Sequence, residues 1–554
     1  MGKGQRSQSI NSLNFPRSVL ENGGLLIPQK LEPLPTVLST TVTARTITAG
    51  SCRWDITGKK NYEELRQEME TAPLYILVIT YLNIFTLILF GHLRDFIGKY
   101  FKPKEYAHLK MNKGYAPLVS DFDSFYTRRM YMRIRDCWNR PITGVPGRQL
   151  NVLERYTPDY NKTFKLTGKV TENLNFSSYN YLGFAQSFGP CADHVEASVK
   201  QLGISSYSTR AEVGTTELHR ELEQVVARFV GKEDAMVISM GFATNSTTIP
   251  ALASKGCLII SDELNHSSII FGVRLSGASV RTFKHNDMND LRELLREAIS
   301  QGQPRTHRSW KKIIVIVEGL YSMEGTIVNL PALIELKKEF KFYLYIDEAH
   351  SIGALGDVGG GVCNFYGIDP SHVDILMGTF TKSFGSAGGY IAGDKAIIDH
   401  LRIHNHAYNY SEPMSVPVAQ QVLTSMRIIS GEDGTNEGQR RIQQLANNSL
   451  YFATRLRQMG FIVYGDTGSP VIPLLLFQPA KIPCFSRELL KRGIAVVVVG
   501  YPATPIISSR ARFCISASHT KNDLDFALQA ISEIGDKLSL KMKKEDVTLK
   551  LLEN

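Results

Sequence analysis

"DILMGTFTKSFGSAGGY", Asp374 to Tyr390, is the stretch from which the fold of this 554-residue chain is predicted most directly. Its start, "DILMGTF", is an apolar run of strand length that predicts a buried strand. Lys382 follows this strand, between hydroxyl residues and glycines. A surface turn would also be rich in Gly and Ser, but the apolar run argues against one. Ligands of open α/β sheets collect at the carboxyl ends of strands, so we expect Lys382 to lie in a ligand-binding crevice.

An amine at such a strand end suits two kinds of chemistry. It can form a Schiff base with a carbonyl cofactor. Alternatively, the neighbouring hydroxyls and glycine amides can cradle an anionic group such as phosphate. The stretch alone leaves both functions open.

The wider chain repeats the pattern of this stretch. Apolar runs of strand length alternate with helix-like segments at 234–239, 257–261, 312–319, 342–347 and 374–380. This alternation predicts an α/β fold with a mainly parallel sheet and helices on both faces. Residues from about 420 to 540 mix helices with short strands, which predicts a smaller α+β domain completed by segments near 120–175.

The expected organisation divides the chain into segments of different composition. The first 65 residues are rich in Ser, Thr, Pro and Gly, and no apolar core of a signal peptide follows the early basic residues. The predicted segments are a flexible extension (1–65), a membrane helix with its flanks (66–110), the N-terminal part of the small domain (111–175), the large cofactor-binding domain (176–415), the C-terminal part of the small domain (416–540) and a tail (541–554).

Residues 72–91, "APLYILVITYLNIFTLILFG", form the predicted membrane helix. They contain no charged residue, and a helix of this length reaches about 30 Å, the thickness of a hydrocarbon core. A buried helix of a soluble domain is the alternative. The flanks differ little in Lys and Arg, so charge does not decide the orientation, and crossing the membrane and lying in its interface both stay open.

Composition excludes few function classes. The chain is 43% hydrophobic and 21% charged, which is ordinary for a globular protein with a large core. The net charge of +10 has no accompanying zinc-finger, helix-turn-helix or RNA-binding signature, and a membrane surface with anionic lipid explains it as well. The seven cysteines form no CxxC pair, which favours a reducing compartment and no structural metal.

Asp347 and His350 add a second set of polar side chains at a strand end. Asp347 closes the run "FYLYID", and His350 follows three residues later. The aspartate could be a helix cap only. Together with Lys382, however, its carboxylate could keep a pyridine nitrogen protonated, which is what makes pyridoxal phosphate an electron sink. His350 could donate to the phenolic oxygen of the same ring.

Two further stretches follow predicted strands. His266, in "SDELNHSSI", could be a structural residue, or could stack on the pyridine ring and contact a substrate carboxylate. The stretch 239–247, "SMGFATNST", is rich in glycine and hydroxyl residues and leads into a helix, so its amides could bind phosphate.

Eight motifs in order resemble the α-oxoamine synthase family of fold-type I pyridoxal-phosphate enzymes. These enzymes condense an amino acid with an acyl-CoA and decarboxylate the product. The resemblance covers about residues 170–540. The motifs are "NYLGF" (180–184), "STRAEVGTTELHRELE" (208–223), "GFATN" (241–245), "DELNHSS" (262–268), "EGLYSMEG" (318–325), "IDEAHSIGALG" (346–356), "GTFTKSFG" (378–385) and "RFCISASHT" (512–520).

The resemblance implies a role for each site residue. For the cofactor it implies a covalent bond to Lys382, a ring-nitrogen contact from Asp347, contacts to the phenolic oxygen from His350 and Ser322, stacking by His266, and a phosphate site made by Thr379 with the Gly241–Phe242 backbone. For the amino-acid substrate it implies binding by Asn180, Tyr181 and Arg512, with Arg510 able to share the carboxylate. Lys382, His266, Asp347 and His350 are the expected catalytic residues.

One segment departs from the family pattern. Residues 410–419, "YSEPMSVPVA", carry Glu412-Pro413 and Val416 where small residues and a double proline are expected. The departure concerns the shape of a loop near the cofactor and leaves the lysine chemistry unaffected.

Outside these motifs, residues 121–142 and 496–505 are similar to the lysine-bearing type 2 long-chain-base subunits of eukaryotic serine palmitoyltransferases. This resemblance implies condensation of L-serine with palmitoyl-CoA to 3-ketodihydrosphingosine, CoA and CO₂, the first step of sphingolipid synthesis. It also implies a lysine-lacking homologous subunit, small membrane regulatory subunits, and an endoplasmic reticulum membrane location with the catalytic domain facing the cytosol.

Two alternatives remain. One is a synthase that uses glycine or alanine and a shorter acyl-CoA. The other is a non-catalytic scaffold subunit, which would be expected to lose the lysine that this chain keeps.

Overall fold

The computed structural model describes residues 62–66, 73–111, 114–117 and 119–543. Most of the predicted extension (1–65) and tail (541–554) therefore lies outside the described residues. The described part begins with a helical turn, α1 (Tyr62–Leu65), and the Tyr62 side chain is buried. The domain boundaries expected within the rest of the chain stay predictions.

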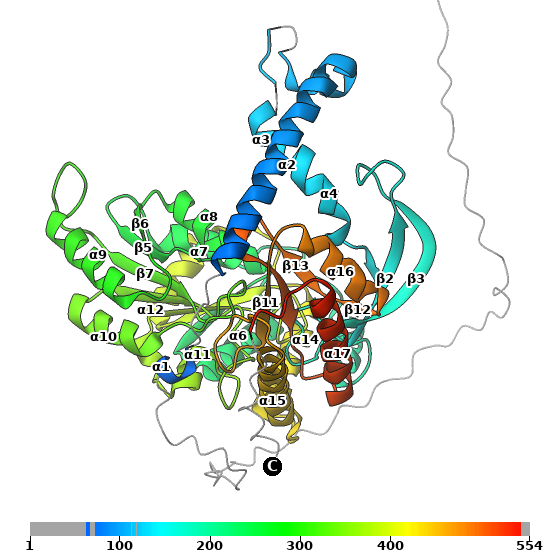
Figure 1. The fold of residues 1–554 in the computed structure, drawn as a ribbon. Coiled ribbons are helices and arrows are strands. Elements are labelled where there is room, and N and C mark those ends of the chain that lie inside the picture. Colours follow the sequence, from blue (N-terminus) through cyan, green and yellow to red (C-terminus); the bar gives the residue numbers. More distant parts are fainter. Residues whose placement is uncertain (1–61, 67–72, 112–113, 118, 544–554) are drawn as a thin grey trace, which may run out of the picture. The chain divides into compact units, whose positions relative to one another are not determined.

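A seven-stranded sheet forms the centre of the fold (Figure 1). The strands β5 to β9 are parallel to one another, whereas β10 is antiparallel to both of its neighbours, β4 and β9. The predicted mainly parallel sheet is confirmed. In spatial order its strands are β4 (Asp234–Ile238), β10 (Gly389–Gly393), β9 (Ile375–Thr379), β8 (Tyr343–Asp347), β7 (Ile313–Glu318), β5 (Leu258–Asp262) and β6 (Ser279–Phe283).

Both faces of this sheet are covered by helices. In β7, Ile314 and Ile316 belong to one cluster of buried side chains, and Val315 and Val317 belong to another. The first cluster includes side chains of α7 (Gly241–Leu252), α8 (Ser267–Ser276) and α12 (Lys395–His404). The second includes side chains of α6 (Glu217–Val230), α9 (Met288–Gln301), α10 (Leu330–Phe340), α11 (Gly361–Tyr366) and α14 (Val416–Ser430). A central strand that is apolar on both sides is typical of a sheet buried between two helical layers.

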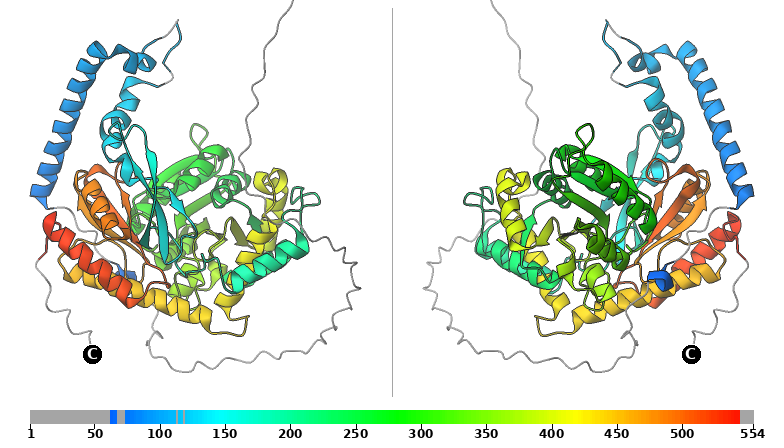
Figure 2. Two further views of the ribbon diagram at one scale, coloured as in Figure 1. Left: turned by 90° about the vertical axis from the view of Figure 1, so that its right-hand side faces the viewer. Right: turned by 90° about the vertical axis from the view of Figure 1, so that its left-hand side faces the viewer.

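Two smaller sheets make up the rest of the α+β architecture (Figure 2). One has the order β1 (Ile142–Thr143), β2 (Gln149–Tyr156), β3 (Lys165–Asn175) and β12 (Ile494–Ala495). The other has the order β11 (Val471–Phe477), β14 (Ser509–Cys514) and β13 (Val497–Val499). Since β3 pairs with β12, segments far apart in the sequence share one sheet. The helices α15 (Glu437–Gln458) and α16 (Lys481–Lys491) pack on these sheets, and α17 (Lys521–Lys537) packs on both helices. By contrast, α5 (Pro190–Leu202) packs on α14, and α13 (His406–Tyr410) packs on α7 and α12.

The predicted membrane helix forms α2 (Leu74–Phe101), which continues beyond the predicted end at residue 91 (Figure 1). Apolar side chains such as Leu74 and Phe85 are 76% and 64% exposed, so the structure does not bury this helix as a core helix. Among the described residues, α2 is the one helix long and apolar enough to cross a membrane.

A charged cluster holds the end of α2. The buried Asp95 carboxylate accepts hydrogen bonds from Arg128 Nη2 at 2.8 Å and Arg129 Nε at 2.6 Å. Both arginines belong to the basic segment after residue 120, which forms a succession of short helical pieces. These are α3 (Asp121–Tyr126), η2 (Thr127–Tyr131), α4 (Met132–Ile134) and η3 (Arg135–Cys137).

Candidate active site

The carboxyl ends of the parallel strands bring the predicted site residues together. Asp347 is the last residue of β8, and Lys382 follows the end of β9 at Thr379. His266 is the N-cap residue of α8, which follows β5. Parallel neighbours end at the same edge of a sheet, so residues far apart in the sequence share one site.

Asp347 is a buried carboxylate held by neutral donors. Its Oδ2 accepts a hydrogen bond from Asn245 Nδ2 at 2.7 Å, and its Oδ1 accepts one from the Ala349 N–H at 2.9 Å. The Tyr345 hydroxyl donates to Asn245 Oδ1 at 2.7 Å and orients this amide. No Lys, Arg or His of the described residues forms an ion pair with Asp347. The carboxylate is therefore positioned and free to pair with a cationic ring nitrogen.

The Lys382 amine lies in the same site without a hydrogen bond to any described residue. Burial lowers the pKa of Lys382 to about 8, although the Asp347 carboxylate opposes this effect. Its Nζ lies 5.4 Å from the centroid of the Tyr179 ring. An amine with this pKa is partly neutral near physiological pH, as a nucleophile or general base requires.

His350 is buried and contacts Tyr181. Its Nδ1 lies 2.8 Å from the Tyr181 hydroxyl. Burial lowers the pKa of His350 well below its usual value, so the imidazole is neutral. Tyr181, whose role in substrate binding stays a prediction, has a fully buried side chain that lies against His350. This contact fixes the orientation of the histidine ring.

Asn180 combines a structural contact with an unused donor. Its Oδ1 accepts a hydrogen bond from the Ala185 N–H at 3.1 Å. Its Nδ2 is buried and has no hydrogen-bond partner among the described residues. A buried donor without a partner is costly, so this amide is suited to a bound ligand.

His266 is fixed on two sides. Its backbone N–H donates to Glu318 Oε1, and its Nδ1 lies 2.8 Å from the Ser268 hydroxyl. Burial lowers the pKa of His266, while Asp347 opposes this effect. The His266 imidazole is therefore an uncharged ring in a fixed position beside the strand end that carries Asp347.

The beginning of α7 has the features of a phosphate site. Met240, the N-cap residue, provides no side-chain hydrogen bond, so the first N–H groups from Gly241 and Phe242 onward lack helical partners. A Cβ atom at Gly241 would lie 2.8 Å from Thr379 Oγ1, which explains the glycine. The Thr379 hydroxyl donates to the Gly388 carbonyl at 2.9 Å and lies 2.9 Å from the Thr381 hydroxyl.

The two arginines of β14 have different environments. Arg510 Nη1 donates to the Met323 carbonyl at 2.7 Å and to Glu324 Oε1 at 3.3 Å. Arg512 is also buried, but its Nε has no hydrogen-bond partner among the described residues, and its Nη1 contacts the uncharged Met323 Sδ at 3.6 Å. A buried guanidinium without an anion is suited to a substrate carboxylate. The structure thus favours Arg512 over Arg510 for this role.

Tyr179 lies among the site residues although the sequence did not predict it. Its ring centroid is 4.6 Å from Arg512 Cζ and 4.8 Å from the His350 ring. Burial raises the pKa of Tyr179 to about 12, while Arg512 and a hydrogen bond with Ser322 lower it. Ser322, predicted near the phenolic oxygen, therefore contacts the site through Tyr179. Asn180, the residue after Tyr179, was predicted. The signal that could have identified Tyr179 is an aromatic residue directly before the motif "NYLGF".

The departing segment 410–419 is held through its backbone. The Ser239 hydroxyl donates to the Glu412 carbonyl at 3.0 Å, and His219 Nε2 lies 2.8 Å from the Met414 carbonyl. Because backbone atoms make these contacts, the unusual side chains do not prevent the segment from reaching the end of β4.

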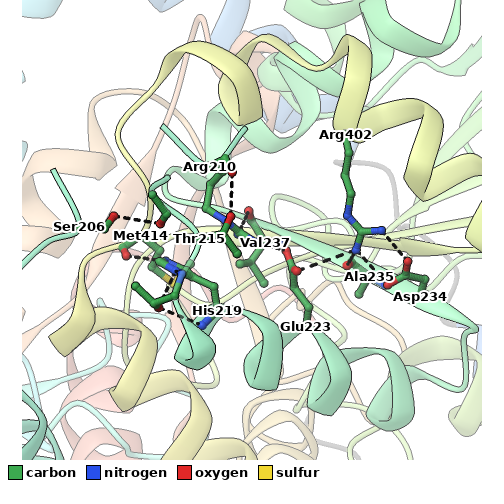
Figure 3. A network of polar contacts seen from close by, with 12 residues as sticks. Ser206, Arg210, Thr215, His219, Glu223, Asp234, Ala235, Val237, Arg402 and Met414 are labelled. Atoms are coloured by element: carbon green, nitrogen blue, oxygen red, sulfur yellow. Dashed lines mark hydrogen bonds and ion pairs between the residues drawn. The ribbon is translucent and has the colours of Figure 1, made fainter. Parts of the chain in front are cut away.

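A buried polar network supports the same region (Figure 3). Arg210 Nη2 donates to Glu223 Oε1 at 3.0 Å, and this oxygen also accepts the Val237 N–H of β4 at 3.0 Å. Arg402 of α12 pairs with Asp234 at 2.7 Å. The network ties the loop after α5 to the strand that precedes α7.

Together these residues fit pyridoxal phosphate. An amine without a partner, a carboxylate without a cation, an uncapped helix start beside two threonines, and an arginine without an anion surround one strand edge. Each matches a different part of the cofactor or of an amino acid bound to it.

Comparison with protein families gives a match over more than half of the chain. Residues 171–531 match the family described as aminotransferase class I and II.

Curated relatives are similar over nearly the whole chain. Serine palmitoyltransferase 2 of Schizosaccharomyces pombe is 56% identical over 478 residues, which cover 86% of this chain and 79% of the relative. Serine palmitoyltransferase 3 of Homo sapiens is 52% identical, with 87% and 88% covered. Long chain base biosynthesis protein 2a of Oryza sativa subsp. japonica is 52% identical, with 85% and 96% covered.

Solved structures share the fold. The serine palmitoyltransferase of Sphingomonas wittichii has a TM-score of 0.67 at 26% identity, covering 77% of this chain and 100% of that one. A serine palmitoyltransferase structure with the PLP internal aldimine has a TM-score of 0.66 at 25% identity, covering 76% and 99%.

Proposed function

Because the chain belongs to the serine palmitoyltransferases within the aminotransferase class I and II family, we propose that it is the subunit that carries the catalytic lysine. It condenses L-serine with palmitoyl-CoA and releases CoA and CO₂, which gives 3-ketodihydrosphingosine. The observation that carries this proposal is the unpartnered Lys382 amine beside the Asp347 carboxylate. A scaffold subunit would have no use for this pair.

Each residue then has a defined task. The cofactor is pyridoxal 5′-phosphate, which supplies an electron sink for the pair left when the serine Cα–H bond breaks. Lys382 holds the cofactor covalently and, once released, its neutral amine takes the Cα proton. Asp347 keeps the ring nitrogen protonated. Thr379 and the first amides of α7, at Gly241 and Phe242, hold the phosphate.

The remaining residues orient the reactants. Arg512 binds the serine carboxylate, and the amide of Asn180 supplies a further donor. His266 stacks on the cofactor ring, and His350, with its ring fixed by Tyr181, donates to the phenolic oxygen. These contacts hold the amino acid in one orientation, which lowers the entropic part of the barrier.

The pH dependence of cofactor capture should report the Lys382 amine. We expect the rate at which cofactor-free protein recaptures pyridoxal phosphate to rise with pH and level off, with a midpoint near pH 8. The neutral amine is the nucleophile, and burial lowers its pKa from 10.5 to about 8, so the reactive form predominates above pH 8. Stopped-flow absorbance measures this rate. A rate that still rises steeply above pH 9.5 would show an ordinary, solvated lysine.

Arg512 and Arg510 should respond differently to replacement by methionine. R512M is expected to raise the KM for serine by about ten- to a hundredfold, since one charge-assisted contact is lost. R510M should instead lower the melting temperature, because it leaves the buried Glu324 carboxylate without its arginine. Steady-state kinetics and thermal unfolding separate the two. An equal KM effect from both variants would mean that they share the carboxylate.

A second subunit is part of the proposal. Large apolar side chains are exposed at Met240 (60%), the N-cap residue of α7, and at Tyr207, Val213 and Tyr410 (85%, 81% and 78%). In fold-type I enzymes the active site lies at a dimer interface, and such a surface suits a partner. We propose a lysine-lacking homologous subunit as that partner.

Membrane attachment completes the proposed function. The apolar surface of α2 supports attachment to a bilayer. The reaction product has a long alkyl chain, and each methylene buried in lipid contributes about 0.8 kcal/mol of favourable free energy. We propose an endoplasmic reticulum location with the catalytic part in the cytosol, and small membrane subunits as regulators.

Product formation tests this function directly. The chain should be purified in detergent or nanodiscs, alone and with the lysine-lacking homologue, and assayed with labelled serine, glycine and alanine against a ladder of acyl-CoAs. We expect serine with palmitoyl-CoA to give the highest turnover per bound cofactor, and only with the homologue. Equal turnover from the chain alone would refute the obligate partner, and a preference for glycine or alanine would refute the substrate.

A further inference from the structure

Glu318 is a buried carboxyl group in the site to which the reaction above gives no task. It is the last residue of β7, as Asp347 is the last residue of β8, and the two are in register. Register neighbours in a parallel sheet project from the same face, so two carboxyl groups stand side by side at the strand edge. Both are nearly inaccessible to solvent, at 5% and 3% exposed.

The contacts of Glu318 are few. Its Oε1 accepts the backbone N–H of His266, and none of the described Lys, Arg or His side chains forms an ion pair with it. The titratable groups that face it from the surrounding elements are Asp347 of β8, Asp262 of β5, Lys382 after β9, His266 of α8, Tyr321 after β7 and Tyr179.

These contacts decide which of the two carboxyl groups carries the charge. Two adjacent buried carboxylates repel each other, so one of them retains a proton. Asp347 accepts hydrogen bonds on both oxygens, from Asn245 and Ala349, and these donors stabilise its anion. Glu318 accepts only one such bond, so its anion is stabilised less and Glu318 is the carboxyl group that keeps the proton. Burial raises the pKa of Glu318 well above its usual value, and Asp347 raises it further.

Glu318 is also connected to Asp347 by a chain of contacts. His266, held by Glu318 through its N–H, has its Nδ1 2.8 Å from the Ser268 hydroxyl. This hydroxyl accepts a hydrogen bond from Asn245 Nδ2 at 3.0 Å, and the same nitrogen donates to Asp347. One continuous chain of contacts thus positions both the stacking histidine, His266, and the ring-nitrogen carboxylate, Asp347.

We propose that Glu318 is a positioning residue that works in its uncharged form. It fixes the start of α8 so that the His266 imidazole lies over the cofactor ring, and it leaves Asp347 as the single anion beside the ring nitrogen. This inference rests on the proposed cofactor chemistry and assigns no step to Glu318 itself.

Replacement by glutamine and by alanine tests the proposal in the holoenzyme with its partner subunit. E318Q keeps an acceptor for the His266 N–H and is uncharged at every pH. We expect it to lose less than about threefold in kcat, and to leave the midpoint of cofactor capture, near pH 8, unchanged. E318A removes the acceptor. We expect it to lower kcat by about ten- to a hundredfold and to weaken the circular dichroism of the bound cofactor, which reports the ring's fixed orientation.

E348Q is the matched control. Glu348 is likewise buried, and its carboxyl group accepts hydrogen bonds from the Val362 N–H at 3.1 Å and from the Ser351 hydroxyl, but none from His266. We expect E348Q to leave the cofactor's circular dichroism unchanged. An E348Q signal as weak as that of E318A would assign the effect to general packing and overturn the proposal.

Three outcomes with E318Q and E318A decide the proposal. A shift of the capture midpoint to lower pH in E318Q would show that the natural side chain is anionic, because removal of a negative charge lowers the lysine pKa. A loss in E318Q as large as in E318A, or no loss in E318A, would also overturn it. If E318A does not fold, the pH midpoint of cofactor capture and the kcat of E318Q decide the proposal. Capture and circular dichroism need neither serine nor acyl-CoA, so they remain informative if the proposed substrates are wrong.

Discussion

Replacement of Lys382 with alanine is expected to remove covalent cofactor binding and to lower kcat by at least about a thousandfold. The residue combines two tasks, since its amine holds the cofactor and later moves the Cα proton. The strand that precedes Lys382, β9, is the direct neighbour of β8, which carries Asp347, whereas Lys284 is exposed and follows β6, three strands away, so it cannot replace Lys382. Arginine would keep the charge but could not become neutral near pH 8.

Borohydride reduction and peptide mapping check the assignment of Lys382. The parent protein should carry the pyridoxyl group on Lys382, and K382A should carry none. K395A is a suitable control, because Lys395 is an exposed lysine that pairs with Asp399 at 2.9 Å on α12, and its loss should leave labelling and turnover unchanged. A pyridoxyl group on another lysine of the parent would refute the assignment.

Replacement of Asp347 with asparagine should preserve the fold and lower kcat by about a hundred- to a thousandfold. The amide keeps an oxygen for the Ala349 N–H, so the strand end is retained. It carries no charge, however, and cannot keep a ring nitrogen protonated, so the electron sink weakens.

Cofactor absorbance, melting temperature and turnover of D347N should be measured on the same preparation. D374N is the control: Asp374 pairs with Lys337 and accepts the Leu344 N–H at 2.7 Å outside the site, so its loss should affect stability and leave turnover of the folded enzyme unchanged. Turnover of D347N within a few-fold of the parent would remove Asp347 from the chemistry.

That Lys382, Asp347 and His266 lie in one site could be predicted, because this requires only that parallel strands end at the same edge of a sheet. Each follows an apolar run, and parallel runs end at one edge. The strands β6 and β10 were not predicted. In β6, "SVRTF", buried and exposed positions alternate over five residues, and β10, "GYIAG", has glycine at both ends, which weakens the strand pattern.

The orientation of individual side chains could not be predicted, because it depends on tertiary contacts. Nothing in the sequence separates Arg510 from Arg512, whereas Glu324 satisfies one and leaves the other free. Similarly, α2 continues past residue 91 into polar sequence because Asp95 finds two arginines in a segment that follows later in the chain.

The pairing of β3 with β12 has a consequence for the synthesis of this chain. The buried end of β3 receives its second neighbour only from Ile494 and Ala495, and the Leu174 N–H donates to the Gly493 carbonyl at 2.8 Å. Residues 176–493 must therefore leave the ribosome first, which takes roughly 15–60 s at the usual rates of translation. During that time a nascent chain presents an unpaired strand edge, a template for aggregation. We therefore expect chaperones to protect this edge of the four-stranded sheet during synthesis.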